Sequence, residues 1–265
     1  MQYGYNPLYT PENVFAIADI QGGADVLENL LAKILPHFGE KDHIVFVGDL
    51  LDGDKKGPEV LKIIADLKAK FPGRVFVVRG NHEQMVLQYI RGNPELWFAN
   101  GGMRTLHQFE KWGVVVSDLY NTKLFKSILE KEGVLHVLED TIQYYETESL
   151  IITHAPLDRT VLALYGGLNT DSRKSHGVLE RMSMEIQWQF LDDERKEIPE
   201  IKKYLICGHQ FGNRSSSPRG EPRVFNTRAF IDCGAGYKHD RPLACLKFPE
   251  KLVFLSDIID TRAPL

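Results

Sequence analysis

The chain has 265 residues, of which 43% are hydrophobic and 26% are charged, a composition typical of a folded globular protein. Its net charge of -4 argues against general affinity for nucleic acid, so no nucleic-acid binding is expected. No segment approaches the roughly 20 apolar residues of a membrane span, and the first residues lack a basic stretch followed by an apolar one. We therefore expect a cytoplasmic protein without a membrane partner, and we interpret residues 1–265 as one domain.

The first third of the chain alternates between two kinds of pattern. Apolar runs at residues 14–18, 43–47 and 75–78 are typical of buried strands. The segments between them, residues 25–35 and 57–71, place their apolar side chains on one helical stripe. Because parallel strands need crossover connections, this alternation predicts consecutive strand-helix-strand units in a parallel sheet.

The rest of the chain predicts further strands around a helical excursion. Residues 93–148 read as a series of short helical pieces. Apolar runs at residues 150–153 and 204–207 again resemble buried strands. Closely spaced short strands typical of an antiparallel sheet follow them, at residues 224–232, 243–248 and 251–256. The whole predicts an α/β fold with two packed sheets and helices outside.

Polar residues of metal-binding type follow five of the predicted strands. Since the ends of parallel strands emerge at one edge of a sheet, these side chains are expected to converge. Taken singly, each has a simpler explanation, because an Asp after a strand is usually a turn or cap residue. The repeated position at strand ends is what favours a metal centre made of Asp19, Asp49, Asn81, His154 and His209.

The chemistry of this set predicts a two-metal hydrolase. The Asp49 carboxylate can bridge two cations, with Asn81, His154 and His209 completing one site and Asp19 holding the other. Oxygen ligands mixed with imidazoles suit Mn, Fe or Zn, and Mn is the ion we expect first. Two such ions about 3.5 to 4 Å apart can lower the pKa of a shared water and clamp a phosphoryl group.

A proton donor is predicted next to this centre. His82 follows Asn81 directly and is the candidate to protonate the leaving oxygen of a phosphoester. Asp52, three residues after Asp49, is the candidate to orient the imidazole and keep it charged.

Four motifs in these segments resemble those of calcineurin-like metallophosphoesterases. Residues 48–53, 79–83, 153–155 and 208–209 are similar, in order, to G-D-x-x-D-R-G, G-N-H-E, the H-A-G segment and the G-H-T segment. The branch that the chain resembles is the phosphoprotein phosphatase family, with its bacterial and phage members and the symmetric dinucleoside tetraphosphatases. The resemblance implies a four-layer αββα sandwich of two mixed sheets flanked by helices, a dinuclear metal centre, and hydrolysis of phosphoesters.

Three positions depart from the family pattern. Its D-x-H motif reads Asp19-Ile20-Gln21, so an amide oxygen replaces an imidazole and the first metal should bind more weakly. Gly53 and Gln189 stand where relatives carry arginines that grip the substrate phosphate. We expect Asn81 with Arg214 and Arg219, which follow His209, to bind substrate instead.

Three functions remain open from the sequence. The first is hydrolysis of phosphate monoesters, with a phosphoprotein, nucleotide or small phosphoester as partner. The second is a phosphodiesterase or nucleoside di- or polyphosphate hydrolase, in which the missing arginines make room for a substituted phosphate. The third is a non-catalytic protein that binds a phosphorylated ligand.

Overall fold

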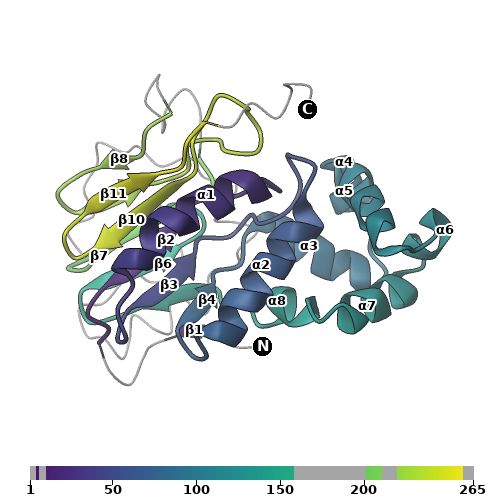
Figure 1. Ribbon diagram of the computed structural model, residues 1–265, viewed down its shortest axis with the longest axis horizontal. Helices are drawn as coiled ribbons and strands as arrows, with labels where there is room; N and C mark the ends of the chain where they lie inside the picture. Colours follow the sequence, from purple (N-terminus) through teal and green to yellow (C-terminus); the bar gives the residue numbers. More distant parts are fainter. Residues whose placement is uncertain (1–3, 6–9, 158–200, 211–219, 259–265) are drawn as a thin grey trace.

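The computed structural model describes residues 4–5, 10–157, 201–210 and 220–258 of the chain. These residues form two mixed β-sheets flanked by helices (Figure 1), as predicted. Among them, no helix is both long and apolar enough to cross a bilayer.

The five-stranded sheet carries the amino-terminal strands. Its order is β11 (Leu252–Leu255), β10 (Ala244–Phe248), β2 (Val14–Ile17), β3 (His43–Phe46), β4 (Val75–Val77). Strands β2, β3 and β4 are parallel, and β10 runs antiparallel to both β2 and β11. The parallel strand-helix-strand units and the antiparallel carboxy-terminal strands are thus both present.

The six-stranded sheet combines segments that are distant in sequence. Its order is β1 (Gly4–Tyr5), β5 (Tyr144–Glu146), β6 (Leu150–Thr153), β7 (Tyr204–Cys207), β9 (Arg228–Phe230), β8 (Arg223–Val224). Strands β6, β7 and β9 are parallel to one another.

The strand predicted over residues 224–232 differs in two ways. It is split into β8 and β9 by a turn, closed by the Phe225 N–H bond to the Arg228 carbonyl at 2.8 Å. Although β8 and β9 pair antiparallel, β9 joins β7 in parallel. All three residues of β9 are buried, which suits a position between two strands better than one at an edge.

Two helices cover the five-stranded sheet (Figure 1). Helix α1 (Ala24–Ile34), followed by the short helix η1 (Leu35–His37), contacts β11, and α2 (Gly57–Lys70) contacts β4. The apolar stripe expected for the first helix is buried, as shown by Val26, Leu27, Leu30, Leu31 and Ile34. The helical period of the sequence therefore predicted correctly which face of α1 is buried.

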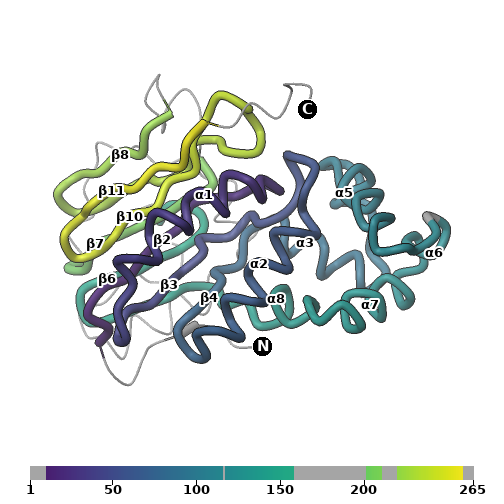
Figure 2. Tube along the Cα trace, viewed as in Figure 1, coloured from purple at the N-terminus to yellow at the C-terminus, as the bar shows by residue number. Residues whose placement is uncertain are grey.

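The next helices form a lobe beside the sheets, from blue to teal in Figure 2. They are α3 (Asn81–Ile90), α4 (Glu95–Ala99), α5 (Gly102–Gln108), η2 (Phe109–Trp112), α6 (Val116–Leu119), α7 (Thr122–Lys131) and α8 (Leu135–Glu139). Residues 93–148 were predicted to be helical, but β5 lies within this range. Its three residues pair with β6 and return the chain to the six-stranded sheet.

The two sheets pack on each other through aromatic side chains. Tyr204 of β7 stacks on Phe248 of β10 with ring centroids 5.4 Å apart. Tyr145 of β5 packs against Phe76 of β4 at the same separation. Tyr145 and Tyr204 are buried, and burying a side chain of this size is worth about 2 to 3 kcal/mol, so these contacts hold the two sheets together.

Candidate metal centre

Five strand ends, drawn from both sheets, meet at one place. Asp19 follows β2, Asp49 follows β3, Asn81 begins α3 after β4, and His154 and His209 follow β6 and β7. The loops are bonded directly: the backbone N–H groups of Ile20 and Gln21 donate to the Asp49 carbonyl at 3.0 and 2.9 Å. The structure thus brings together the five residues that the sequence placed at strand ends.

One cluster of ligand atoms surrounds His154. Ligand atoms of Asp49, His154 and His209 lie within 4.8 Å of one another, and Asn81 Oδ1 lies 3.0 Å from His154 Nε2. His154 donates its Nδ1 proton to the Val47 carbonyl at 2.9 Å, and burial lowers the pKa of His154 to about 4. Nε2 therefore carries a lone pair, as Asn81 Oδ1 does. Two lone pairs facing each other fit a cation between them.

A second group of oxygens faces the other side of Asp49. Gln21 Nε2 donates to Asp49 Oδ2 at 2.9 Å, so the side-chain oxygen of Gln21, Oε1, does not take part in this bond. Within the described residues, Gln21 Oε1 and Asp19 Oδ1 are buried and have no hydrogen-bond partner. A native fold seldom leaves such acceptors unsatisfied, and a bound cation satisfies them. The residues present on both sides of Asp49 thus fit the binding of divalent cations.

The charges at this edge also favour cations. Burial raises the pKa of Asp19, and the neighbouring carboxylates of Asp232 and Asp49 raise it further. Burial acts to raise the pKa of Asp49 as well, but the adjacent histidines, His154 first, bring it below its usual value. Like charges held this close repel each other unless positive charge lies between them.

Backbone strain is concentrated here. Of five described non-glycine residues with positive φ, four belong to this region: Gln21 (50°), Asp49 (50°), Asp52 (70°) and His209 (66°). Such conformations cost free energy and persist where function requires them. The neighbouring glycines are needed for space, because a Cβ on Gly208 would lie 1.9 Å from Asp19 Oδ1.

Glu83 holds the Asp49 loop in place, a role that the sequence did not reveal. Its buried carboxylate accepts three backbone N–H bonds, from Asp49 (2.8 Å), Leu50 (2.8 Å) and Gly80 (2.9 Å). The bond from the Gly80 N–H caps the amino-terminal end of α3, because Gly80 is the N-cap residue and Glu83 is the third residue of the helix. The available signal was the Glu of the G-N-H-E motif itself.

A proton-donating group adjoins the metal cluster. His82 Nδ1 lies 2.5 Å from Asp52 Oδ2, and the Asp52 carboxylate also accepts from Trp97 Nε1 and the Thr105 hydroxyl. Burial acts to lower the pKa of His82, but the charge of Asp49 and the bond to Asp52 raise it to about 9. We call the set His82, Asp52, Trp97 and Thr105 the acid assembly. An imidazolium oriented by a buried carboxylate is suited to general-acid catalysis.

Two further residues near the centre were missed by sequence reasoning. The Tyr237 hydroxyl lies 3.1 Å from His82 Nε2. Asp232 is buried, and burial raises its pKa to about 7. None of the four sequence motifs includes either residue.

The expected substrate-binding residues are placed less completely. Arg214, Arg219 and Gln189 lie outside the described residues. Asn81 lies at the centre, partly exposed. At position 53 no arginine fits, because φ is 62° and a Cβ would lie 2.7 Å from the Gln21 carbonyl oxygen. The backbone, and not only the sequence, thus excludes the family arginine there.

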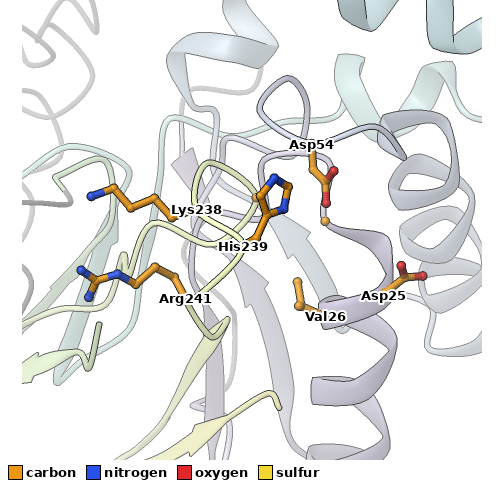
Figure 3. A pocket seen from close by; sticks show the side chains of 8 residues that line it. Asp25, Val26, Asp54, Lys238, His239 and Arg241 are labelled. Carbon is orange, nitrogen blue, oxygen red and sulfur yellow. The ribbon is translucent and has the colours of Figure 1, made fainter. Parts of the chain in front are cut away.

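Basic side chains lie on the loop that follows Tyr237. Figure 3 shows Lys238, His239 and Arg241 along one side of a small cavity of about 10 Å³, with Asp25 and Asp54 on the other. Lys56, two residues after Asp54, forms an ion pair with Asp25 at 2.7 Å. The cavity has room for about one water, so these residues are better placed to shape the local charge than to enclose a ligand.

Comparison with known proteins agrees with this geometry. Residues 13–240 match the sequence profile of the calcineurin-like phosphoesterases. PrpE of Bacillus subtilis, an asymmetrical bis(5'-nucleosyl)-tetraphosphatase, is 25% identical over 251 residues, or 88% of this chain and 90% of PrpE. The serine/threonine-protein phosphatase PP1-1 of Saccharomyces cerevisiae is 30% identical over 104 residues, which cover 39% of this chain and 32% of PP1-1.

A solved structure shows the same fold. The cold-active protein-tyrosine phosphatase of a psychrophilic Shewanella superposes with a TM-score of 0.57 at 17% identity, covering 97% of this chain and 83% of the phosphatase. At this identity the likeness concerns the arrangement of sheets and helices.

Proposed function

The chain belongs to the calcineurin-like phosphoesterase family and is a hydrolase, and we propose that it hydrolyses phosphate monoesters with a pair of divalent metal ions, Mn first. The observation that carries this proposal is the position of the acid assembly beside the metal ligands. A protein that only bound phosphate would have no use for a charged imidazole oriented by a buried carboxylate.

Each residue of the centre has a role in this proposal. Asp49, Asn81, His154 and His209 hold one ion. Asp19, Gln21 and again Asp49 hold the other. When bound, the ions supply the Lewis acidity that activates a water and offsets the charge of the phosphoryl group. Glu83 keeps Asp49 between the two sites through its three backbone bonds.

The acid assembly favours esters with poor leaving groups. Asp52 accepts from His82 Nδ1, so His82 Nε2 is the nitrogen that faces the leaving side. An alkyl alcohol is a strongly basic leaving group and gains most from protonation as the ester bond breaks. Phosphorylated alcohols, whether in a protein or in a small molecule, therefore suit this site best.

A nucleoside polyphosphate is the second candidate substrate. PrpE, which is named as a tetraphosphatase, aligns over nearly the whole of both chains. Because position 53 is a glycine, the site lacks one of the arginines that grip a monoester phosphate in relatives. The basic side chains after Tyr237 would attract a substrate with several negative charges.

The test measures kcat/KM of the purified protein with added Mn on three substrates: a phosphoserine peptide, para-nitrophenyl phosphate and diadenosine tetraphosphate. We expect turnover of the first two, loss of activity on chelation, and recovery when Mn is restored. A large preference for diadenosine tetraphosphate would select the second candidate instead. Tight binding of phosphate without turnover of any substrate would support a non-catalytic role.

The His82→Ala variant tests the acid. We expect its kcat/KM on the phosphoserine peptide to fall by about 10² to 10⁴, with para-nitrophenyl phosphate nearly unaffected. His107→Ala is the control, because His107 pairs with Glu110 at the surface, away from the centre. Equal losses on both substrates would assign His82 to the metal site.

A further inference from the structure

Both ring nitrogens of His82 are occupied by side chains. Nδ1 is 2.5 Å from Asp52, and Nε2 is 3.1 Å from the Tyr237 hydroxyl. A leaving-group oxygen that is to take a proton from Nε2 must come within about 3 Å of it. The Tyr237 oxygen already holds that position.

Tyr237 is not easily displaced from it. The preceding residue, Gly236, has φ of 75° and packs so closely that a Cβ there would lie 2.4 Å from the Gln21 carbonyl oxygen. Gln21 is in turn bonded to Asp49 through its side chain. The loop that carries Tyr237 is therefore tied to the loops that carry the metal ligands.

The direction of the hydrogen bond follows from the chemistry of the acid. A His82 that acts as a general acid carries its proton on Nε2, since Nδ1 donates to the Asp52 carboxylate. Nε2–H then donates to the Tyr237 oxygen. The phenol proton of Tyr237 then points away from His82, and the residue is 42% exposed.

We propose that Tyr237 is a catalytic residue that passes the proton of His82 to the leaving-group oxygen, a role that rests on the hydrolysis proposed above. As the P–O bond breaks, its electron pair goes to the leaving oxygen, which takes the phenol proton of Tyr237. The phenol oxygen takes the Nε2 proton of His82. The imidazole of His82 is then neutral and is reprotonated by solvent. The attacking water forms the new P–O bond and loses its proton to solvent.

The two transfers take place together. No free phenolate forms, because the Nε2 proton of His82 reaches the phenol oxygen as the phenol proton leaves it. The relay also extends the reach of His82 by the length of one hydroxyl group. It places the leaving group at the exposed side of the Tyr237 ring, where a bulky alcohol has room.

The chain offers a matched control for a Tyr237→Phe variant. Tyr120 is 41% exposed, and its hydroxyl lies 3.2 Å from His107 Nε2, outside the site. Tyr120→Phe removes a similar hydroxyl from a similar histidine. Both variants, His82→Ala and the double variant His82→Ala/Tyr237→Phe are assayed with Mn on the phosphoserine peptide and on para-nitrophenyl phosphate.

The readout is the ratio of kcat/KM on the peptide to that on the aryl ester. Tyr237→Phe should lower this ratio by about 10- to 100-fold, and Tyr120→Phe should leave it unchanged. The double variant should have the same ratio as His82→Ala alone, because both residues act on one proton path. A structural defect would lower kcat/KM on both substrates together and would leave the ratio unchanged.

The outcomes separate this proposal from the proposed function. If the wild-type protein is active and Tyr237→Phe keeps or raises the ratio, His82 protonates the leaving group directly and the relay is refuted. Additive losses in the double variant would refute it as well. If the wild-type protein hydrolyses neither ester, the monoesterase function fails, and the relay fails with it.

Discussion

Replacing Asp52 with Asn removes a buried charge while nearly preserving the shape of the side chain. Residue 52 has φ of 70°, a conformation that Asn adopts as readily as Asp. The amide oxygen can still accept from His82 and Trp97. The amide nitrogen then faces Thr105, whose hydroxyl can turn to accept. The variant therefore tests the charge of Asp52 with little disturbance of packing.

The size of the effect follows from the bond that is weakened. A hydrogen bond between charged groups contributes about 1.5 to 3 kcal/mol, and the bond from His82 to Asp52 is short and buried. About 1.4 kcal/mol corresponds to a tenfold change in rate. Asp52→Asn should thus lower kcat/KM on the phosphoserine peptide by about 10- to 150-fold, and on para-nitrophenyl phosphate by much less.

The assay compares the two esters at saturating Mn and follows Mn binding by calorimetry in parallel. Asp54→Asn is the control, because Asp54 lies in the same loop but its carboxylate accepts from the neighbouring Lys55 N–H. Equal losses on both esters, or a loss of Mn affinity that matches the loss of rate, would show that Asp52 supports the metal site and not the acid.

Three other predictions follow from the same structure. Gln21→His should raise the affinity of the weaker site for Mn by about 10-fold or more, which is the size of change usually seen when residues around a metal are altered. Calorimetry measures this affinity, and an unchanged value would show that Gln21 is not a metal ligand. Gly53→Ala should lower the free energy of unfolding more than Gly73→Ala does, because both have positive φ but only position 53 is crowded by Gln21; equal losses in denaturant titrations would contradict this. Burial, with the charge of Arg74, lowers the pKa of His43 to about 4, so below pH 6.5 the unfolded chain takes up a proton that the folded protein does not. The free energy of unfolding should therefore fall as pH drops from about 6.5 to 4, and His43→Gln should reduce that fall in pH-dependent denaturation.

The strand ends and the ligands at them were accessible from sequence for a physical reason. A buried strand needs a continuous apolar run, and a functional residue placed just after it interrupts that run visibly, as Asp49 does after residues 43–47. The family resemblance and the two-sheet fold were confirmed. The roles of the individual ligands stay predictions, although the structure brings them together.

Other features depend on contacts that leave no local pattern. Tyr237 lies 155 positions from His82, and its hydroxyl meets the ring only because the two sheets pack face to face. Glu83 could have been a metal ligand or a backbone acceptor, and its direction is set by where the Asp49 loop turns. The sequence of a three-residue strand such as β9 does not distinguish parallel from antiparallel pairing, so the direction of pairing is set by the neighbouring strand in the fold.

The hydrogen bond from the His209 N–H to Asp19 Oδ2, 2.9 Å long, joins residues that are 190 positions apart. The proposed ion sites thus form only after both sheets have docked, and an unfolded chain cannot assemble them. By thermodynamic linkage, Mn at 100 times its dissociation constant would add about 2.7 kcal/mol to the free energy of unfolding. Because loops this long close late in folding, the added free energy should appear mainly as slower unfolding, with little change in the folding rate. Metal availability would then set the lifetime of the folded protein as well as its catalytic competence.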